Sequence, residues 1–217
     1  MTNARGALLV SSLLATSVLT ALLGINDPLA PWSFSSRFLI WNLFLAWIPL
    51  LLAAAFATAR RGVAMLLFGA GWLAFLPNAP YLMTDLVHLG GGENLWRHVL
   101  QFGFAAWTGI LLGVVSMLLV HRRMERAYGA RAGWLTVAVS VVLCAVGVVI
   151  GRFQRWNSWD LLTRPDEVIA ATLAWLRSPM ANIESTGVAF AVAAFFGLAY
   201  VTIWSLTSAR VRPAAGA

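Results

Sequence analysis

The sequence has no lysine, one cysteine and few charged residues of any kind. Charged side chains make up 11% of the 217 residues, whereas hydrophobic ones make up 60%. Soluble proteins carry about 25% charged residues, so this composition excludes an ordinary soluble domain. The lone Cys144 excludes an intrachain disulfide and a cysteine-based metal site. The sequence also lacks a Walker loop, a dinucleotide-binding glycine pattern and a nucleophile elbow.

Long apolar runs are abundant instead. Most of them approach the ~20 residues that a helix needs to cross a ~30 Å hydrocarbon core. The six runs cover residues 7–25, 38–58, 62–76, 99–120, 133–151 and 187–206. No linker or soluble domain separates them, so we predict an all-α polytopic membrane helical bundle with about six transmembrane helices. It would form a single domain over residues 1–217.

The arginines indicate an orientation for this bundle. If the N-terminus is cytoplasmic, nine of the 15 Arg lie on the cytoplasmic side, as the positive-inside rule expects. Seven of the eight acids then lie outside, so the net charge of +7 belongs to the cytoplasmic face. Topology and anionic lipid explain this charge better than a nucleic-acid partner does. We therefore expect a multi-pass protein of the inner (plasma) membrane with both termini cytoplasmic.

The third apolar run is short and ends at prolines. As a helix, residues 62–76 reach about 22 Å, less than the ~30 Å core. One interpretation is a helix broken at Pro77 and Pro80 below the outer interface, with the segment that follows facing the bundle interior. Asn78 would then satisfy freed backbone groups. The alternative is a helix that ends at Pro77 in a tilted or thinned setting and continues as an ordinary loop.

A polar stripe follows the two prolines. The spacing i, i+3, i+4 and i+7 relates Tyr81, Thr84, Asp85 and His88, which places them on one face of a short helix. A carboxylate and an imidazole in a lipid-compatible stretch need either a partner or a function. The stripe is therefore a candidate site, with Asp85 and His88 as candidate proton carriers.

The second concentration of polar residues is the segment 151–160, which the six-helix topology places on the same outer face. Arg152 and Arg155 are three residues apart at the end of the fifth run, so we predict that both guanidiniums point to one side. There they would neutralise Asp85 or together bind an anion. We predict that Asp85 contacts one of them and that Asn78 belongs to the same network. The alternative is an aromatic belt with arginines that reach the lipid headgroups.

A short amphipathic helix is predicted just beyond this segment. Pro165 is followed by two acids, which is typical of a first helical turn, and Ser178 with Pro179 ends the pattern. The apolar residues between these ends gather on one side. We expect an interfacial helix on the outer surface of the membrane.

Two runs of the chain, WLAFLPNAPYLMTDLVHL and GRFQRWNSWDLL, resemble the signature segments of an uncharacterised bacterial membrane-protein family, domain of unknown function 1361. The resemblance covers most of the chain in order and hydropathy. It implies a polytopic membrane fold and no established activity. The signature positions that it marks are Pro77, Asn78, Pro80, Tyr81, Thr84, Asp85, His88, Gly151, Arg152, Arg155, Asn157, Ser158 and Asp160.

Three classes of function remain open. The favoured hypothesis is an outer-face polar pocket for a small anionic or lipid-headgroup ligand, because the polar groups of the two segments exceed what one ion pair would need. The alternatives are a structural or assembly protein whose polar motifs only brace the bundle, and a membrane-embedded enzyme acting at the outer leaflet. The candidate ligand-binding residues are Asn78, Tyr81, Asp85, His88, Arg152, Arg155, Asn157 and Asp160.

We expect no metal and no cofactor. A metal site would have to use Asp85 and His88, with Asp160 or Glu93, and this set lacks a diagnostic spacing. Haem is not expected either, because paired axial histidines on facing helices are not evident. The expected partners are the lipid bilayer and the proposed ligand.

Overall fold

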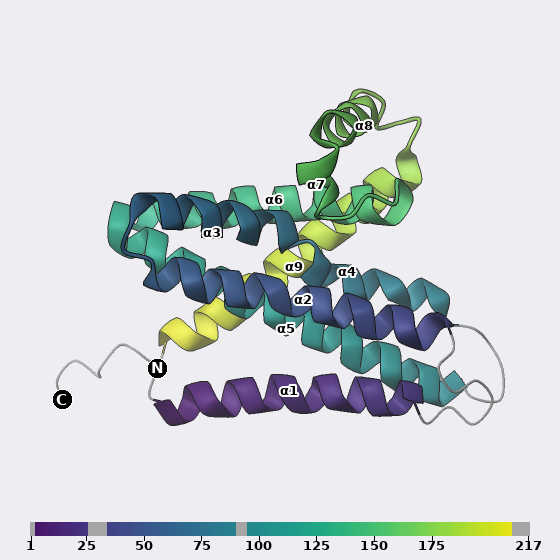
Figure 1. The fold of residues 1–217 in the computed structure, drawn as a ribbon, viewed down its shortest axis with the longest axis horizontal. Coiled ribbons are helices and arrows are strands. Elements are labelled where there is room, and N and C mark those ends of the chain that lie inside the picture. The colour runs from purple at the N-terminus through teal and green to yellow at the C-terminus, as the bar shows by residue number, and fades with distance from the viewer. Residues whose placement is uncertain (1–2, 26–33, 90–94, 210–217) are drawn as a thin grey trace.

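The computed structural model describes residues 3–25, 34–89 and 95–209, and the regular elements of this part of the chain are all helical (Figure 1). In chain order they are α1 (Asn3–Ile25), α2 (Phe34–Thr58), α3 (Gly62–Phe75), α4 (Asn78–Thr84), the 3-10 helix η1 (Asp85–His88), α5 (Leu95–Tyr128), α6 (Ala130–Phe153), α7 (Asp160–Thr163), α8 (Pro165–Arg177) and α9 (Ile183–Ala209). The predicted all-α fold class is confirmed.

Within the described residues, six helical stretches are long and apolar enough to cross a membrane. They are Ala4–Gly24, Arg37–Thr58, Gly62–His88, Leu95–Tyr128, Ala130–Phe153 and Ile183–Ser208. Each contains or overlaps one of the predicted apolar runs, so the prediction of a multi-pass membrane bundle is confirmed. Figure 1 shows the start of α1 and the end of α9 at the same end of the bundle, as an even number of crossings requires.

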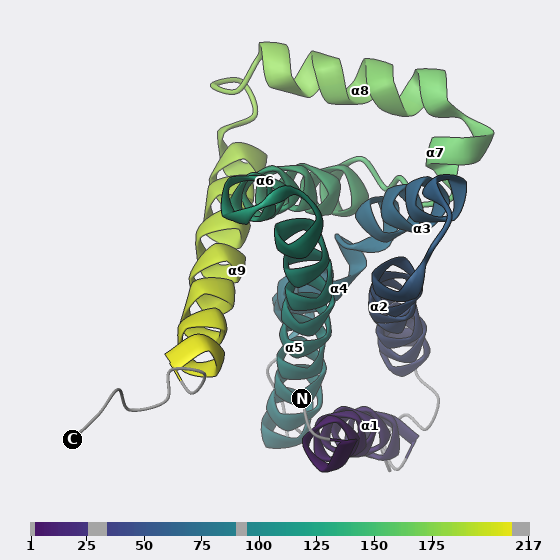
Figure 2. The same cartoon turned by 90° about the vertical axis from the view of Figure 1, so that its left-hand side faces the viewer.

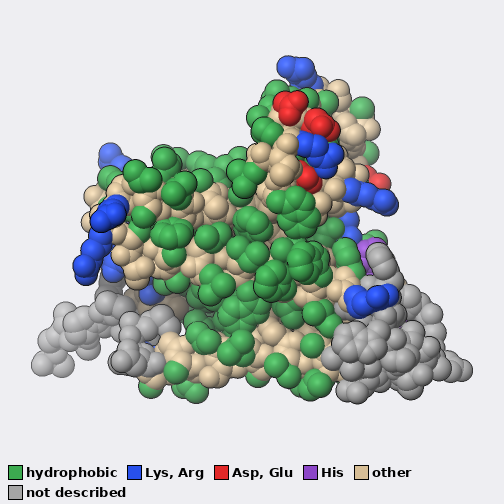
Figure 3. Space-filling model, in the orientation of Figure 1, with side chains coloured by type: hydrophobic (Ala, Val, Ile, Leu, Met, Phe, Trp, Pro, Cys, Tyr) green, Lys and Arg blue, Asp and Glu red, His purple; other side chains and the backbone are tan. Residues whose placement is uncertain are grey.

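The distribution of side chains on the surface fits this arrangement. Figure 3 shows hydrophobic side chains over the middle of one face and charged side chains gathered toward its two ends. Individual apolar residues such as Leu66, Phe190 and Leu198 are 72%, 74% and 68% exposed. An apolar band between charged ends matches the hydrocarbon core and its two interfaces.

The centre of the bundle is α5, which packs against α1, α2, α4, α6 and α9 (Figure 2). Two glycines of α5 allow its neighbours to approach closely. A Cβ at Gly109 would overlap the carbonyl oxygen of Ala79 in α4, and one at Gly113 would lie 2.9 Å from the Phe196 ring of α9. The GxxxG pattern of α5 therefore serves packing within the chain.

The third span consists of α3, α4 and η1. A two-residue turn separates the end of α3 at Phe75 from the start of α4 at Asn78. Helix α4 packs against α2 and α5, and its Leu82 has no exposed surface. The turn itself is accommodated by α6, where a Cβ on Gly147 would overlap the ring of Pro77. The segment after the turn is helical, with Ala79, Pro80 and Leu82 buried.

Helix α8 lies across the bundle instead of along it (Figure 2). It begins at Pro165 and ends at Arg177, as the capping pattern predicts. The indole N–H of Trp175 donates to Ser185 Oγ of α9 at 2.8 Å, which fixes one end of α8. The short α7 connects the other end to the loop that follows α6. The helix is thus confirmed, whereas its position on the membrane surface stays a prediction.

A second polar cluster lies far along α5 from α4. His121 is buried, and its Nδ1 forms a hydrogen bond with the hydroxyl of Tyr200 in α9. Trp134 packs against the imidazole edge-to-face with ring centres 4.9 Å apart. A Cβ on Gly133 would lie 2.6 Å from the same imidazole. His121 thus joins α5, α6 and α9 by packing around one polar contact.

Candidate functional site

Arg152, in the last turn of α6, contacts every residue of the predicted polar stripe. Its guanidinium forms an ion pair with Asp85 and donates hydrogen bonds of 3.0 and 2.7 Å to Thr84 Oγ1. Its third nitrogen lies 3.1 Å from His88 Nε2, and the guanidinium carbon lies 4.4 Å from the centre of the Tyr81 ring. The prediction that Asp85 contacts one of the two arginines is confirmed.

Asp85 is completely closed to solvent. One carboxylate oxygen accepts from Arg152, and the other accepts from the side-chain amide of Asn42 in α2 at 3.1 Å. A buried carboxylate is tolerated where both a counter-charge and hydrogen bonds satisfy it. This network joins α2, η1 and α6. Asn42 was missed as a partner, although an amide in the middle of an apolar run is a sequence signal for a polar contact inside the bundle.

His88 accepts a hydrogen bond from Arg152 in this arrangement. An arginine only donates hydrogen bonds, so Nε2 of His88 accepts the one from Arg152 and the imidazole proton lies on Nδ1. The ring also packs edge-to-face with Phe38 of α2, with ring centres 6.1 Å apart.

Asn78 belongs to a different network from the one predicted. Its amide donates to the carbonyl oxygen of Phe75 and to Ser158 Oγ, each at 2.9 Å. The first bond satisfies a backbone group freed at the turn, as predicted. The prediction that Asn78 joins the Asp85 network is wrong, because seven residues of helix separate the two side chains by about 10 Å. Asn78 instead ties the start of α4 to the loop after α6.

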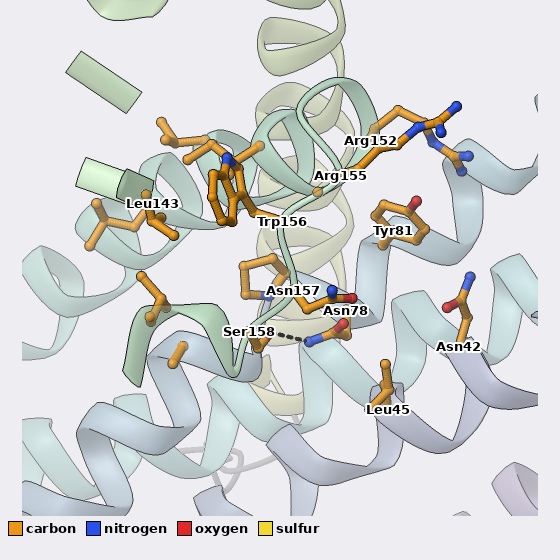
Figure 4. Close-up of a pocket in the computed structure, with 18 of the residues that line it drawn as sticks. Asn42, Leu45, Asn78, Tyr81, Leu143, Arg152, Arg155, Trp156, Asn157 and Ser158 are labelled. Atoms are coloured by element: carbon orange, nitrogen blue, oxygen red, sulfur yellow. Dashed lines mark hydrogen bonds between the residues drawn. The ribbon is translucent and has the colours of Figure 1, made fainter. Parts of the chain in front are cut away.

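Arg155 does not lie on the helix that carries Arg152. Helix α6 ends at Phe153, and Arg155 has a φ of 61° in the left-handed region. The helical spacing used to predict its direction therefore does not apply. Its side chain nevertheless extends the same way as that of Arg152 in Figure 4. Arg155 is exposed, and its guanidinium makes no hydrogen bond or ion pair with the described part of the chain.

Asp160 is held inside a turn. Its carboxylate accepts from the backbone N–H of Asn157 at 2.8 Å and from Arg164 at 3.1 Å. The Asn157 hydrogen bond first, and the Arg164 guanidinium with it, hold the pKa of Asp160 below its ordinary value. Arg164 also stacks on the ring of Trp156, 4.6 Å from its centre. These contacts shape the loop between α6 and α8.

A cavity of about 1010 Å³ lies between α2, α3, α4, α6 and α8. Six of the eight candidate residues line it, namely Asn78, Tyr81, His88, Arg152, Arg155 and Asn157. Asp85 and Asp160 do not line it, because the contacts described above enclose them. Among the described residues that line the cavity, none is Asp or Glu.

The two arginines of this cavity lie on the same side as Tyr81 and Asn42, where apolar residues such as Leu45 also lie (Figure 4). Figure 4 shows Arg152, Tyr81 and Asn42 on one side and Leu143 on the other, with Trp156 between them. The apolar side is built by α3, α6 and α8. Such a cavity matches the usual pattern of ligand sites, which combine an apolar lining with a few polar groups.

The described residues hold no group of three or more His, Cys, Asp or Glu side chains placed to bind a metal ion. Asp85 and His88 both contact Arg152, and Asp160 contacts Arg164. Glu93, the remaining ligand considered above, lies outside the described residues.

Comparison with known proteins agrees with the resemblance seen in the two signature segments. A search of curated proteins and a search of solved structures each found no match to this chain. A family model described as "Protein of unknown function (DUF1361)" matches residues 41–202, which include both signature segments and the residues of the site. The chain therefore belongs to the DUF1361 family of membrane proteins of unknown function.

Proposed function

We propose that the cavity binds a small anionic or lipid-headgroup ligand, and that Arg155 is the side chain that holds it. The observation that carries this proposal is the difference between the two arginines. Arg152 is engaged by an ion pair, hydrogen bonds and an aromatic ring. Arg155 faces the same cavity, and its N–H groups have no partner among the described residues. A guanidinium in this state offers a planar set of donors suited to a phosphate or carboxylate.

The charge balance of the cavity supports an anion. Asp85 neutralises Arg152, so Arg155 contributes a net positive charge to a lining that contains no described acid. The surrounding apolar side chains lower the local dielectric and strengthen the attraction for a negative group. The amide of Asn157 adds a polar group to the same cavity lining.

The backbone at Arg155 gives independent support. A side chain in the left-handed region costs roughly 1–2 kcal/mol, which glycine avoids. Stability alone therefore favours glycine at this position. Strained residues persist where function needs their side chain in that place. Arg155 fits this description, since its guanidinium adds no contact that would offset the strain within the described residues.

The test is a substitution that removes the guanidinium and relieves the strain together. We expect Arg155→Gly to melt in detergent at or above the wild-type temperature without ligand. Inorganic phosphate or glycerol 3-phosphate should raise the melting temperature of the wild type and of a control variant, Arg177→Gln, but not that of Arg155→Gly. At 100 times the dissociation constant the ligand would stabilise the wild type by about 2.7 kcal/mol. A variant that melts lower and keeps the ligand response would instead support the structural alternative.

A bracing role is favoured for the paired residues themselves. Asp85, Arg152 and Asp160 satisfy one another or their neighbours, and both acids are outside the cavity lining. We therefore propose binding for the cavity and no catalysis by these acids. For the hydrogen-bond networks of Asp85 and Asp160 we therefore keep the alternative that they only brace the bundle.

We further propose that the cavity opens at the outer face and that both termini are cytoplasmic in the inner membrane. The support is the arginine distribution of the sequence and the acids that gather around α7 and α8. Alkaline phosphatase inserted between α8 and α9 should be active, and the same enzyme inserted between α5 and α6 should be inactive. The reverse pattern would invert the orientation.

A further inference from the structure

We infer that the ligand of this cavity is a membrane phospholipid, with its phosphate at Arg155 and one hydrocarbon chain along the apolar wall formed by α3, α6 and α8. This inference rests on the proposed function and adds the chemical class of the ligand. It starts from the size of the cavity. About 1010 Å³ lies at the upper end of the ~300–1,000 Å³ of ordinary ligand sites. A phosphate ion at Arg155 would leave most of this volume, and most of its apolar lining, in contact with water.

The second step is the separation of polar and apolar groups along α6. This helix contributes Arg152 at the polar side and Leu143 at the apolar side. Nine residues of helix separate them by about 14 Å. Val146 and Ile150 line the cavity between these points, and Leu73 faces it from α3. A ligand that fills this space has an anionic end and a hydrocarbon part of comparable length.

The third step is the role of α8, which covers the apolar side. Val168, Ile169 and Leu173 of α8 all line the cavity. Val168 is buried, whereas Ile169 and Leu173 are 55% and 43% exposed. Leu143 of α6 opposes them with 44% of its surface exposed. Hydrocarbon from outside the chain is what would cover these side chains.

The fourth step is the direction of the cavity relative to the membrane. Two of the three helices of its apolar wall, α3 and α6, belong to spanning segments, and its arginines lie where α6 ends. A phospholipid in a bilayer has the same arrangement, with its phosphate at the interface and its chains parallel to the spanning helices. It can thus enter sideways from one leaflet without turning over. A soluble amphiphile would need no such alignment.

The experiment compares the lipid with its soluble headgroup. Purified, delipidated protein is incubated with phosphatidylglycerol and, separately, with glycerol 3-phosphate, and binding is measured by native mass spectrometry and calorimetry. Val146→Trp fills the apolar side, and Val142→Trp places the same ring on the lipid-facing surface of the same helix as the matched control. We expect Val146→Trp to weaken phosphatidylglycerol binding by about tenfold or more. Glycerol 3-phosphate binding should change by less than about twofold.

A second pair of variants, in α8, tests the same cavity in case the substitutions in α6 disturb folding. Ile169→Trp places a ring under α8, and Leu176→Trp places one elsewhere on that helix, outside the cavity lining. Ile169→Trp should repeat the loss of lipid binding, and Leu176→Trp should not. Phosphatidylglycerol with a diazirine in its chain should label α6 and α8 near Leu143 and Leu173 more than it labels Phe190, a surface residue of α9.

The outcomes separate the two proposals. If both cavity-filling variants bind phosphatidylglycerol as their controls do, while Arg155→Gly still abolishes glycerol 3-phosphate binding, the lipid inference is wrong and the anion site stands. If Arg155→Gly binds both probes as the wild type does, the anion site is wrong and the lipid inference fails with it. Loss of phosphatidylglycerol binding in both cavity-filling variants and in Arg155→Gly, with the controls unchanged, supports the inference.

Discussion

Exchanging the side chains of Asn42 and Asp85 tests whether charge and hydrogen bonding stabilise the buried network of Asn42, Asp85 and Arg152. The carboxylate of Asp85 has no exposed surface, and its two oxygens accept from Arg152 and from the Asn42 amide. In Asp85→Asn one oxygen is replaced by an NH2 group, which then faces another donor, and Arg152 loses its counter-charge. Breaking a buried ion pair by removing one partner costs about 3–5 kcal/mol, so we expect a loss of this size.

The double variant Asn42→Asp/Asp85→Asn restores the original set of charges, hydrogen-bond donors and acceptors. Its carboxylate moves to α2, its amide moves to η1, and every donor again has an acceptor. We expect it to be more stable than either single variant, since Asn42→Asp alone places two carboxylates together in a buried site. Unfolding in mixed micelles with increasing dodecyl sulfate gives the free energies of unfolding. A loss below about 1 kcal/mol for Asp85→Asn, typical of exposed pairs, or a double variant no better than the single ones, would refute this reasoning.

Two further predictions concern packing and pH. Gly147→Ala should lower the free energy of unfolding by about 1–3 kcal/mol, because its Cβ overlaps the ring of Pro77. Gly187→Ala, where a Cβ meets nothing within 4 Å, should be neutral or stabilising in the same dodecyl sulfate titration. The hydrogen bond from Asn157 lowers the pKa of Asp160, so its contribution to stability is present above the ordinary pKa of 3.8 and disappears as the pH falls below it. Asp160→Asn should flatten this acid dependence of the melting temperature, and an unchanged slope would contradict the assignment.

Hydropathy and helical spacing predicted the parts of this molecule that depend on local chemistry. The six spans follow from apolar length alone, and α8 follows from its capping residues. The stripe also met expectation, because residues at i, i+3, i+4 and i+7 stay on one face even where α4 tightens into η1. Arg152 contacts each of them from a segment 64 to 71 positions away in the chain.

The errors concern contacts that no local pattern encodes. Asn42 is one amide in an apolar run, and only the packing of α2 against α4 shows that it meets Asp85. Arg155 extends the same way as Arg152 (Figure 4), but the helical spacing used to predict this does not apply, because α6 ends two residues earlier and Arg155 has a left-handed φ. Asp160 was expected at the ligand site because it lies in the same segment. The turn instead closes its carboxylate onto its own loop.

The pairing of Asp85 with Arg152 has a consequence for how the chain is made. The two residues lie 67 positions apart, so at ~5–20 residues per second the ribosome adds the arginine roughly 3–13 s after the acid. During this interval Asn42 is the polar partner already synthesised, and a carboxyl group in the bilayer is less costly when protonated. The third span therefore gains its ion pair with Arg152 only after the fifth span has been made. Nascent chains arrested before and after residue 152 should differ in protease protection, and equal protection would show that the acid is secured earlier.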